Sequence, residues 1–332
     1  MNTVRRLHLC IWNLALLIAL ALTVQTVAIQ TAAGQSPAVN GANTSRSSSN
    51  GKPITIPLTI KINSRQLEPE TELQSIDLTV NEDGDPQTIL SIRGVGTNSP
   101  ITLAVLIQDD VVSSVGNEIK SLAEFITNLP KGSRVMVGYL RTGSLQVKQK
   151  FTQDLEKASK ALRPPTGFAS AGPYNPYIEV IEALRKFDSQ PLGRRAILLV
   201  SDGLDVSRGV DSSSPTQSVD LQRAVNESQR RGVAIYGFYA PTVVASASPL
   251  LAANAQSSLL RLSNETGGHA FFQGTGVPVS FDPFIRELDT SLQKQVALTF
   301  LSTHTGKGFH KIEVKSATPG VRVTYPSGYV VR

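Results

Sequence analysis

Two acidic loops in the sequence each follow a buried run of apolar residues. The stretch 101–119, ITLAVLIQDDVVSSVGNEI, runs from a predicted strand directly into Asp109 and Asp110. The apolar run AILLV is followed in the same way by Asp202 and then Asp205. Oxygen ligands clustered at the end of a strand often hold a divalent cation. Because doubly wound sheets bind ligands at the carboxyl ends of their strands, we expect the two loops to lie together and form the candidate site.

The characteristic motifs of several enzyme classes are missing from the sequence. No Gly-x-Gly-x-x-Gly follows the first apolar strand, and no Gly-x-x-x-x-Gly-Lys phosphate loop is present. Ser201 lacks the flanking glycines of a nucleophile elbow. His269, His304 and His310 are not adjacent to the acidic loops, so we expect surface or packing roles for them. The sequence therefore predicts a protein that is not an enzyme.

Composition and charge argue against nucleic-acid binding and against sites that depend on cysteine. The chain has 332 residues and a net charge of +6, but its basic residues are scattered, so nucleic-acid binding is not expected. The only cysteine, Cys10, lies in the N-terminal apolar run, which excludes disulfides and cysteine–zinc sites from the remainder of the chain.

The N-terminal part of the chain predicts export. Residues 1–33 have a basic start, an apolar run and small residues at the exit, which is typical of a secretory signal peptide. An uncleaved membrane anchor is the alternative, and it would be the chain's only contact with a membrane. Residues 34–52 are rich in Ser, Asn and Gly and predict a flexible linker. We expect a secreted, periplasmic or cell-surface protein, and export without disulfides favours a bacterial one.

The elements that position the acidic loops follow from the periodicity of apolar residues. Residues 98–293 alternate strand and helix patterns, which predicts an α/β fold with a doubly wound, mostly parallel sheet. Residues 53–97 and 294–332 have β patterns on either side, and we expect the two segments to pair in a small sandwich. The acidic turn 82–86 resembles no calcium loop and predicts a solvated hairpin tip.

Four sequence blocks in this α/β region resemble a known family. The blocks SLAEFITNLPKGSRVMVGYL, AILLVSDGLDVSRG, GVAIYGFYA and LSNETGGHAFF resemble, in this order, a von Willebrand factor A domain. The flanks IDLTVNEDGDPQTI and FHKIEVKSATPGVRVTYPSGYVV are similar to those of secreted bacterial proteins related to that domain. The resemblance implies a Rossmann-like sheet with one antiparallel edge strand, and a protein that binds other macromolecules.

The resemblance also implies a metal-ion-dependent adhesion site, but one with a degenerate ligand set. The family carries Asp-x-Ser-x-Ser after the first strand, a threonine in a later loop and a distal aspartate, which Asp202 matches. Thr166 is the only threonine in the appropriate loop.

The first motif fits in two registers. Counting back from the helix gives Asp109 and Ser113, with Val111 between them; counting forward from the strand gives Gln108 and Asp110. Neither register restores a full ligand set, because valine cannot coordinate and glutamine carries no charge. We therefore expect no cofactor, with Mg²⁺ or Ca²⁺ held by Asp109, Asp110, Ser113, Thr166 and Asp202 as the alternative.

These observations together predict an exported, non-enzymatic protein-binding module of the adhesion type. A protein partner is expected to dock over the loops around Asp109, Thr166 and Asp202. The alternative is a structural subunit of a bacterial envelope assembly that uses its β segments to complete another subunit's sheet. A hydrolase that uses the acidic loops is a more distant alternative. The sequence leaves the partner and the oligomeric state open.

Overall fold

The computed structural model describes residues 51–62, 77–94, 96 and 98–332. These all belong to the compact unit Ser48–Arg332. The predicted signal segment 1–33 and nearly all of the linker 34–52 lie outside the described residues, so their predictions remain predictions. Within the described residues, none of the helices is long and apolar enough to cross a membrane.

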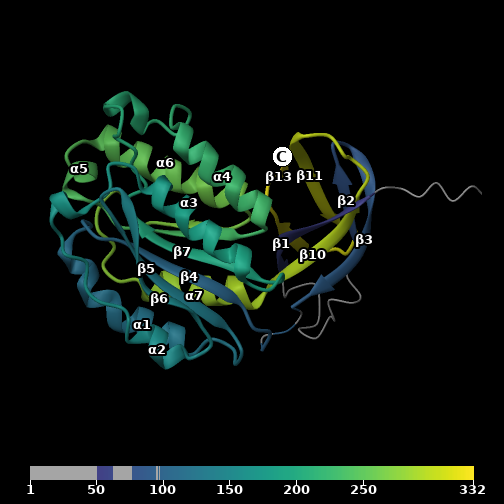
Figure 1. Cartoon of the computed structure of the whole chain (residues 1–332), viewed down its shortest axis with the longest axis horizontal. Coiled ribbons are helices and arrows are strands. Elements are labelled where there is room, and N and C mark those ends of the chain that lie inside the picture. The colour runs from purple at the N-terminus through teal and green to yellow at the C-terminus, as the bar shows by residue number, and fades with distance from the viewer. Residues whose placement is uncertain (1–50, 63–76, 95, 97) are drawn as a thin grey trace, which may run out of the picture. The chain divides into compact units, whose positions relative to one another are not determined.

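The α/β part of the chain is built on a six-stranded sheet (Figure 1). Its strands, in spatial order, are β6 (Ser144–Thr152), β5 (Arg134–Arg141), β4 (Thr102–Gln108), β7 (Arg195–Ser201), β8 (Ala234–Tyr239) and β9 (Ala270–Phe271). All neighbouring pairs are parallel except β5 and β6, which are antiparallel. Every residue of β4, β7 and β8 is buried, as their continuous apolar runs predict for strands covered on both faces.

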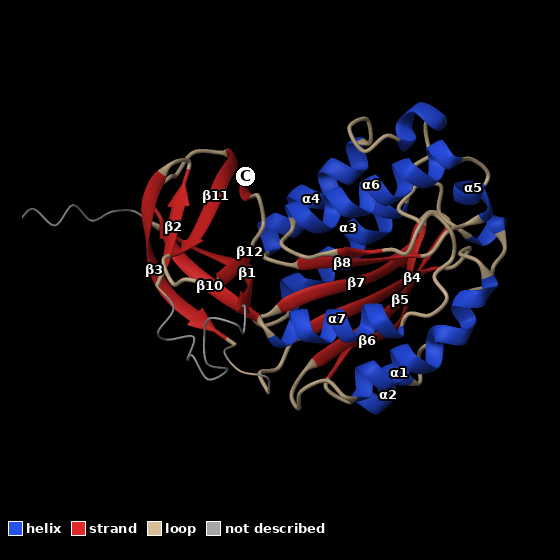
Figure 2. Cartoon of the chain, turned by 180° about the vertical axis from the view of Figure 1, so that it is seen from behind, coloured by secondary structure: helices blue, strands red, loops and turns tan. Residues whose placement is uncertain are grey.

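Helices cover both faces of this sheet (Figures 1 and 2). One apolar core includes buried residues of α1 (Ile119–Thr127), α2 (Leu155–Ser159) and α7 (Asp282–Gln293). The other includes buried residues of α3 (Pro176–Lys186), α4 (Val219–Arg231), α5 (Val243–Ser246) and α6 (Pro249–Glu265). Short 3₁₀ turns are η2 (Ser113–Glu118), η3 (Ala169–Ala171), η4 (Phe187–Ser189) and η5 (Val210–Ser213). The predicted alternation of strand and helix is therefore confirmed.

The helix boundaries follow from local signals in the sequence. At the start of α3, the Asn175 side chain accepts a hydrogen bond from the Tyr177 backbone N–H, and Pro176 occupies the first turn. The Ser218 side chain caps α4 in the same way. Gly232 ends α4 in a left-handed conformation, with φ of 60°.

The flanking β segments form a second sheet, which is antiparallel and seven-stranded. Its strands, in spatial order, are β12 (Val321–Thr324), β1 (Lys52–Ile62), β10 (Gln295–Ser302), β3 (Asp85–Arg93), β2 (Leu78–Glu82), β11 (Gly308–Ser316) and β13 (Gly328–Val331). The N- and C-terminal segments do pair with each other, because β1 and β3 both flank β10, and β2 pairs with β11. They form one curved sheet around its own core instead of the expected two-sheet sandwich (Figure 2).

The antiparallel sheet contacts the end of α4 and strand β8. The Thr59 Oγ1 and Tyr236 Oη atoms lie 3.4 Å apart. The Gln229 Nε2 atom donates a hydrogen bond of 3.0 Å to Ser327 Oγ. Gly232 fits here because a Cβ atom at this position would lie only 2.6 Å from the carbonyl oxygen of Thr55.

Candidate functional site

The two acidic loops meet at the carboxyl ends of β4 and β7. These strands are parallel neighbours, with Ile107 opposite Val200, so the residues that follow them emerge side by side. A cavity of about 260 Å³ lies at this end of the sheet and is lined in part by Gln108, Asp110 and Asp202. This is the meeting of the two loops that the sequence predicted.

Gln108 connects the two acidic loops at the floor of the cavity. Its Nε2 atom donates a 2.9 Å hydrogen bond to Asp110 Oδ1. Its Oε1 atom accepts a 2.5 Å hydrogen bond from Ser201 Oγ and a 3.3 Å hydrogen bond from the Asp202 backbone N–H. The neutral Gln108 amide therefore bonds to both loops, to Asp110 on one side and to Ser201 and Asp202 on the other.

Asp202 is buried and already has two hydrogen-bond donors. Its Oδ1 accepts from the Leu204 backbone N–H at 2.9 Å, and its Oδ2 accepts from Thr242 Oγ1 at 2.6 Å. Burial raises the pKa of Asp202 to about 6, and the nearby carboxylate of Asp110 acts in the same direction. Burial also raises the pKa of Asp110. A positive charge entering the cavity would therefore be stabilised by both side chains.

Asp109 lies outside this cavity and forms an ion-paired cluster of its own. Its fully buried carboxylate accepts two hydrogen bonds of 2.8 Å from the Arg163 guanidinium. The Nε atom of Arg141 lies 3.1 Å from Asp109 Oδ2. The Thr166 N–H also donates to Asp109 Oδ1, and the Thr166 hydroxyl donates to the Asp109 carbonyl. The Arg163 guanidinium lies 4.0 Å above the Tyr139 ring centre.

The five residues singled out from the sequence thus lie in three places. Asp110 and Asp202 line the cavity. Asp109 and Thr166 bond to each other beside it. Ser113 is exposed at the start of η2. The sequence reasoning missed Thr242, which follows β8, and Arg163, whose positive charge balances the negative charge of Asp109.

Two exposed apolar side chains line the cavity, and two more are close to them in the chain. Tyr174 and Val244 line the cavity and are 70% and 41% exposed. Phe168, in the same loop as Tyr174, and Val243, next to Val244 in α5, are 70% and 69% exposed. We call these four residues, together with Asp110 and Asp202, the loop surface.

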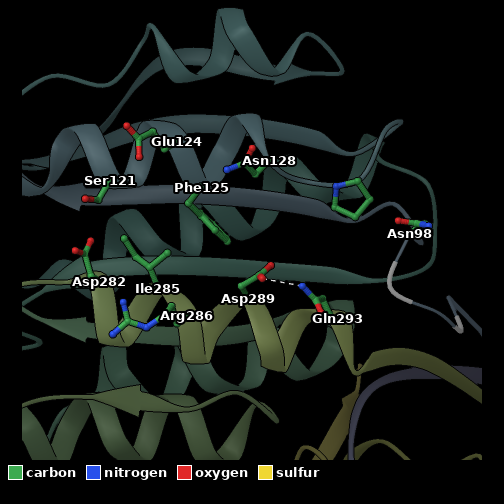
Figure 3. A pocket seen from close by; sticks show the side chains of 11 residues that line it. Asn98, Ser121, Glu124, Phe125, Asn128, Asp282, Ile285, Arg286, Asp289 and Gln293 are labelled. Carbon is green, nitrogen blue, oxygen red and sulfur yellow. Dashed lines mark hydrogen bonds between the residues drawn. The ribbon is translucent and has the colours of Figure 1, made fainter. Parts of the chain in front are cut away.

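A larger cavity, of about 400 Å³, lies between α1 and α7 (Figure 3). Phe125 and Ile285 contribute apolar surface to it, and Glu124 and Asp282 contribute carboxylates. Asp289 Oδ2 accepts a 2.7 Å hydrogen bond from Gln293 Nε2, shown as a dashed line. None of the residues singled out from the sequence lines this cavity.

The antiparallel sheet holds a second cluster, which the sequence reasoning missed. Ligand atoms of Glu82, Asp83, His304 and His310 all lie within 4.8 Å of one another. The expectation of a solvated hairpin tip is wrong for Glu82, which is fully buried. The pairing of β2 with β11 brings His310 to this acidic turn, which is separate from the two acidic loops of the α/β part.

Comparison with known proteins gives distant structural likenesses. No protein-family profile matches the sequence, and no curated protein matches it. An aerotolerance-related membrane protein from Bacteroides fragilis aligns with 59% of this chain and 99% of its own, at 12% identity and a TM-score of 0.40. BatB from Bacteroides thetaiotaomicron aligns over 59% and 98%, at 12% identity and a TM-score of 0.41. The SpRpn10 VWA domain aligns over 58% and 93%, at 13% identity and a TM-score of 0.36.

These alignments are too distant to carry an argument about function. The strand order does carry an argument about fold, because five parallel strands are bordered by one antiparallel edge strand, β6. That is the arrangement implied by the sequence blocks quoted above. The α/β part of the chain therefore has the Rossmann-like sheet with one antiparallel edge strand that the resemblance implied.

Proposed function

We propose that this chain is a non-enzymatic protein-binding module whose partner docks on the loop surface. The observation that carries the proposal is the pair of exposed apolar side chains, Tyr174 and Val244, in the lining of a cavity that also holds the carboxylates of Asp110 and Asp202. Phe168 and Val243, close to them in the chain, are exposed as well. Clustered exposed apolar side chains mark interaction surfaces, and aromatic residues contribute most to their binding energy.

The chemistry of the cavity favours a partner with a basic side chain. Asp110 and Asp202 both line the cavity, whereas the charge of Asp109 is compensated by Arg163 and Arg141. A lysine or arginine of the partner can enter a cavity of about 260 Å³ and pair with these two carboxylates. The surrounding apolar side chains would cover the stem of that residue and exclude water.

We further propose that this binding does not depend on a metal ion. Magnesium requires hard oxygen ligands with negative charge. At the loop surface the Gln108 amide donates to Asp110, and the Thr242 hydroxyl donates to Asp202. Gln108 thus supplies a neutral amide where a metal would need a charged oxygen, and both carboxylates already accept hydrogen bonds from protein donors.

The place of action that we propose is outside the cytoplasm, and residues 1–33 support it through their signal-peptide pattern. The alternative, in which the β segments complete another subunit's sheet, has less support. The outer strands β12 and β13 each have only four residues, and short edge strands are a common means of avoiding strand addition.

Site-specific photo-crosslinking tests the docking surface. A photoreactive amino acid is placed at Tyr174 in the full chain, and at Leu192, which is 72% exposed, as the matched control. In envelope extracts of the producing organism, we expect one defined adduct from position 174 and none from position 192. Asp110→Asn with Asp202→Asn should weaken the adduct, and a chelator should leave it unchanged. Equal adducts from both positions, or loss of the adduct with the chelator, would contradict the proposal.

A further inference from the structure

The cluster in the antiparallel sheet has the donor set of a transition-metal site. We propose that Glu82, Asp83, His304 and His310 bind one divalent transition-metal ion of the zinc type. Two imidazole nitrogens and two carboxylate oxygens are ligands that zinc accepts in a tetrahedral arrangement. Four protein ligands fill that arrangement, so the metal would have a structural role.

The distances within the cluster are close to those that a metal needs. His310 Nδ1 lies 2.8 Å from Asp83 Oδ2 and 3.5 Å from Glu82 Oε1. His304 Nδ1 lies 3.6 Å from the same Asp83 oxygen. Zinc–ligand bonds of about 2.0–2.2 Å separate tetrahedral ligands by roughly 3.4 Å. A small contraction of the widest pairs, which lie within 4.8 Å, would complete the shell.

Both histidines are oriented as metal ligands usually are. The His310 Nε2 atom is 2.9 Å from the Gly306 carbonyl, which can only accept, so Nε2 carries the proton. The His304 Nε2 atom lies 3.2 Å from Asp85 Oδ2. In each ring the far nitrogen is therefore held by an acceptor, and Nδ1 faces the carboxylates. Metal-binding histidines are commonly oriented through their second nitrogen in this way.

Glu82 supplies an independent observation that points to a ligand. Its side chain is fully buried, and its Oε1 accepts hydrogen bonds from Tyr329 Oη at 2.5 Å and Ser302 Oγ at 3.0 Å. Its Oε2 has no hydrogen-bond partner among the described residues. A buried carboxylate oxygen without a partner is costly, and a bound cation would remove that cost. Among the described ion pairs, only histidines contact Glu82 and Asp83.

The site would connect parts of the chain that are far apart in sequence. Glu82 and Asp83 lie at the β2–β3 turn, whereas His304 and His310 lie after β10 and in β11. The turn itself is preformed, since Asp83 and Gly84 have φ of 52° and 99°, as a tight Asp-Gly hairpin requires. A metal ion here would hold the N-terminal β segment against the C-terminal one.

Zinc titration of the full chain, without an added histidine tag and after treatment with a chelator, tests the proposal. We expect calorimetry to show one Zn²⁺ ion per chain and the thermal unfolding midpoint to rise with Zn²⁺. Cobalt should give the visible absorption of a tetrahedral site. His304→Gln, at a partly exposed position, should weaken Zn²⁺ binding about tenfold or more and remove the cobalt spectrum. His269→Gln, the same change at an exposed histidine in the α/β part, should alter neither.

Asp83→Asn provides a second variant in case His304→Gln disturbs the fold, because asparagine tolerates the left-handed conformation of this residue. It should weaken Zn²⁺ binding while the circular dichroism spectrum stays unchanged. The proposal is overturned if the unmodified chain shows no zinc heat. It is equally overturned if both folded variants bind zinc as tightly as the unmodified chain. Partner binding at the loop surface is a separate measurement and does not depend on this outcome.

Discussion

Replacing Arg163 by methionine tests whether Asp109 is held by ion pairing. Methionine replaces the aliphatic stem of Arg163 but lacks its guanidinium. That guanidinium donates two 2.8 Å hydrogen bonds to the fully buried carboxylate of Asp109. Removing one partner of a buried ion pair costs about 3–5 kcal/mol. Arg163 is 32% exposed, and Arg141 and Thr166 still contact Asp109. Because of this exposure and these remaining contacts, we expect a loss of free energy of unfolding at or below the lower end of that range, about 2–3 kcal/mol.

A double-mutant cycle, measured by urea denaturation with circular dichroism, isolates this interaction. Asp109→Asn alone should also destabilise the chain, because it leaves the guanidinium without its carboxylate. The double variant Asp109→Asn with Arg163→Met should lose little more than either single variant, which gives a coupling energy of about 2 kcal/mol. Additive losses would refute the reasoning, since they would show that Arg163 does not compensate Asp109 and that its carboxylate is free for another role.

Two further predictions concern stability. Burial raises the pKa of Glu179 from 4.5 to about 7. Between pH 4.5 and 7 the folded chain therefore keeps a proton on Glu179 that the unfolded chain has lost, and the free energy of unfolding falls as pH rises through this range. Glu179→Gln should therefore match the unmodified chain near pH 4.5 and exceed it by about 3 kcal/mol at pH 8 in denaturation experiments; a difference independent of pH would contradict this. Gly232→Ala should cost about 2 kcal/mol or more, because the left-handed backbone and the Thr55 carbonyl both oppose a Cβ atom. Gly143→Ala, also at positive φ but with no atom within 4 Å, should cost only about 1 kcal/mol, and equal losses would argue against the contact between β1 and α4.

The sheet of the α/β part was predictable because its strands are long apolar runs between amphipathic helices. The same property made it impossible to predict which residues at the end of β4 face the cavity. Every residue of β4 is buried, so no alternation tells which of Gln108, Asp109 and Asp110 faces Asp202. The structure shows Gln108 and Asp110 in the cavity and Asp109 paired with Arg163, which lies 54 residues later in the chain. Such a pairing between distant residues has no local sequence signal.

The histidine cluster was hidden for a similar reason. His310 and Asp83 are 227 residues apart and meet only because β2 pairs with β11. A signal for Glu82 was nevertheless present, since Leu78, Val80 and Glu82 alternate along β2 and all three are buried. Alternation placed this carboxylate on the core face, and a buried carboxylate requires a partner.

Calorimetric titration of the metal-stripped chain with Mg²⁺ and with Zn²⁺ tests most directly whether a metal ion binds at the histidine cluster and not at the loop surface. We predict heat of binding from one Zn²⁺ ion per chain, which His304→Gln weakens and Asp202→Asn leaves unchanged. We predict no heat from Mg²⁺ at millimolar concentration. Heat from Mg²⁺ that disappears in Asp202→Asn, or Zn²⁺ binding that His304→Gln leaves intact, would contradict the account.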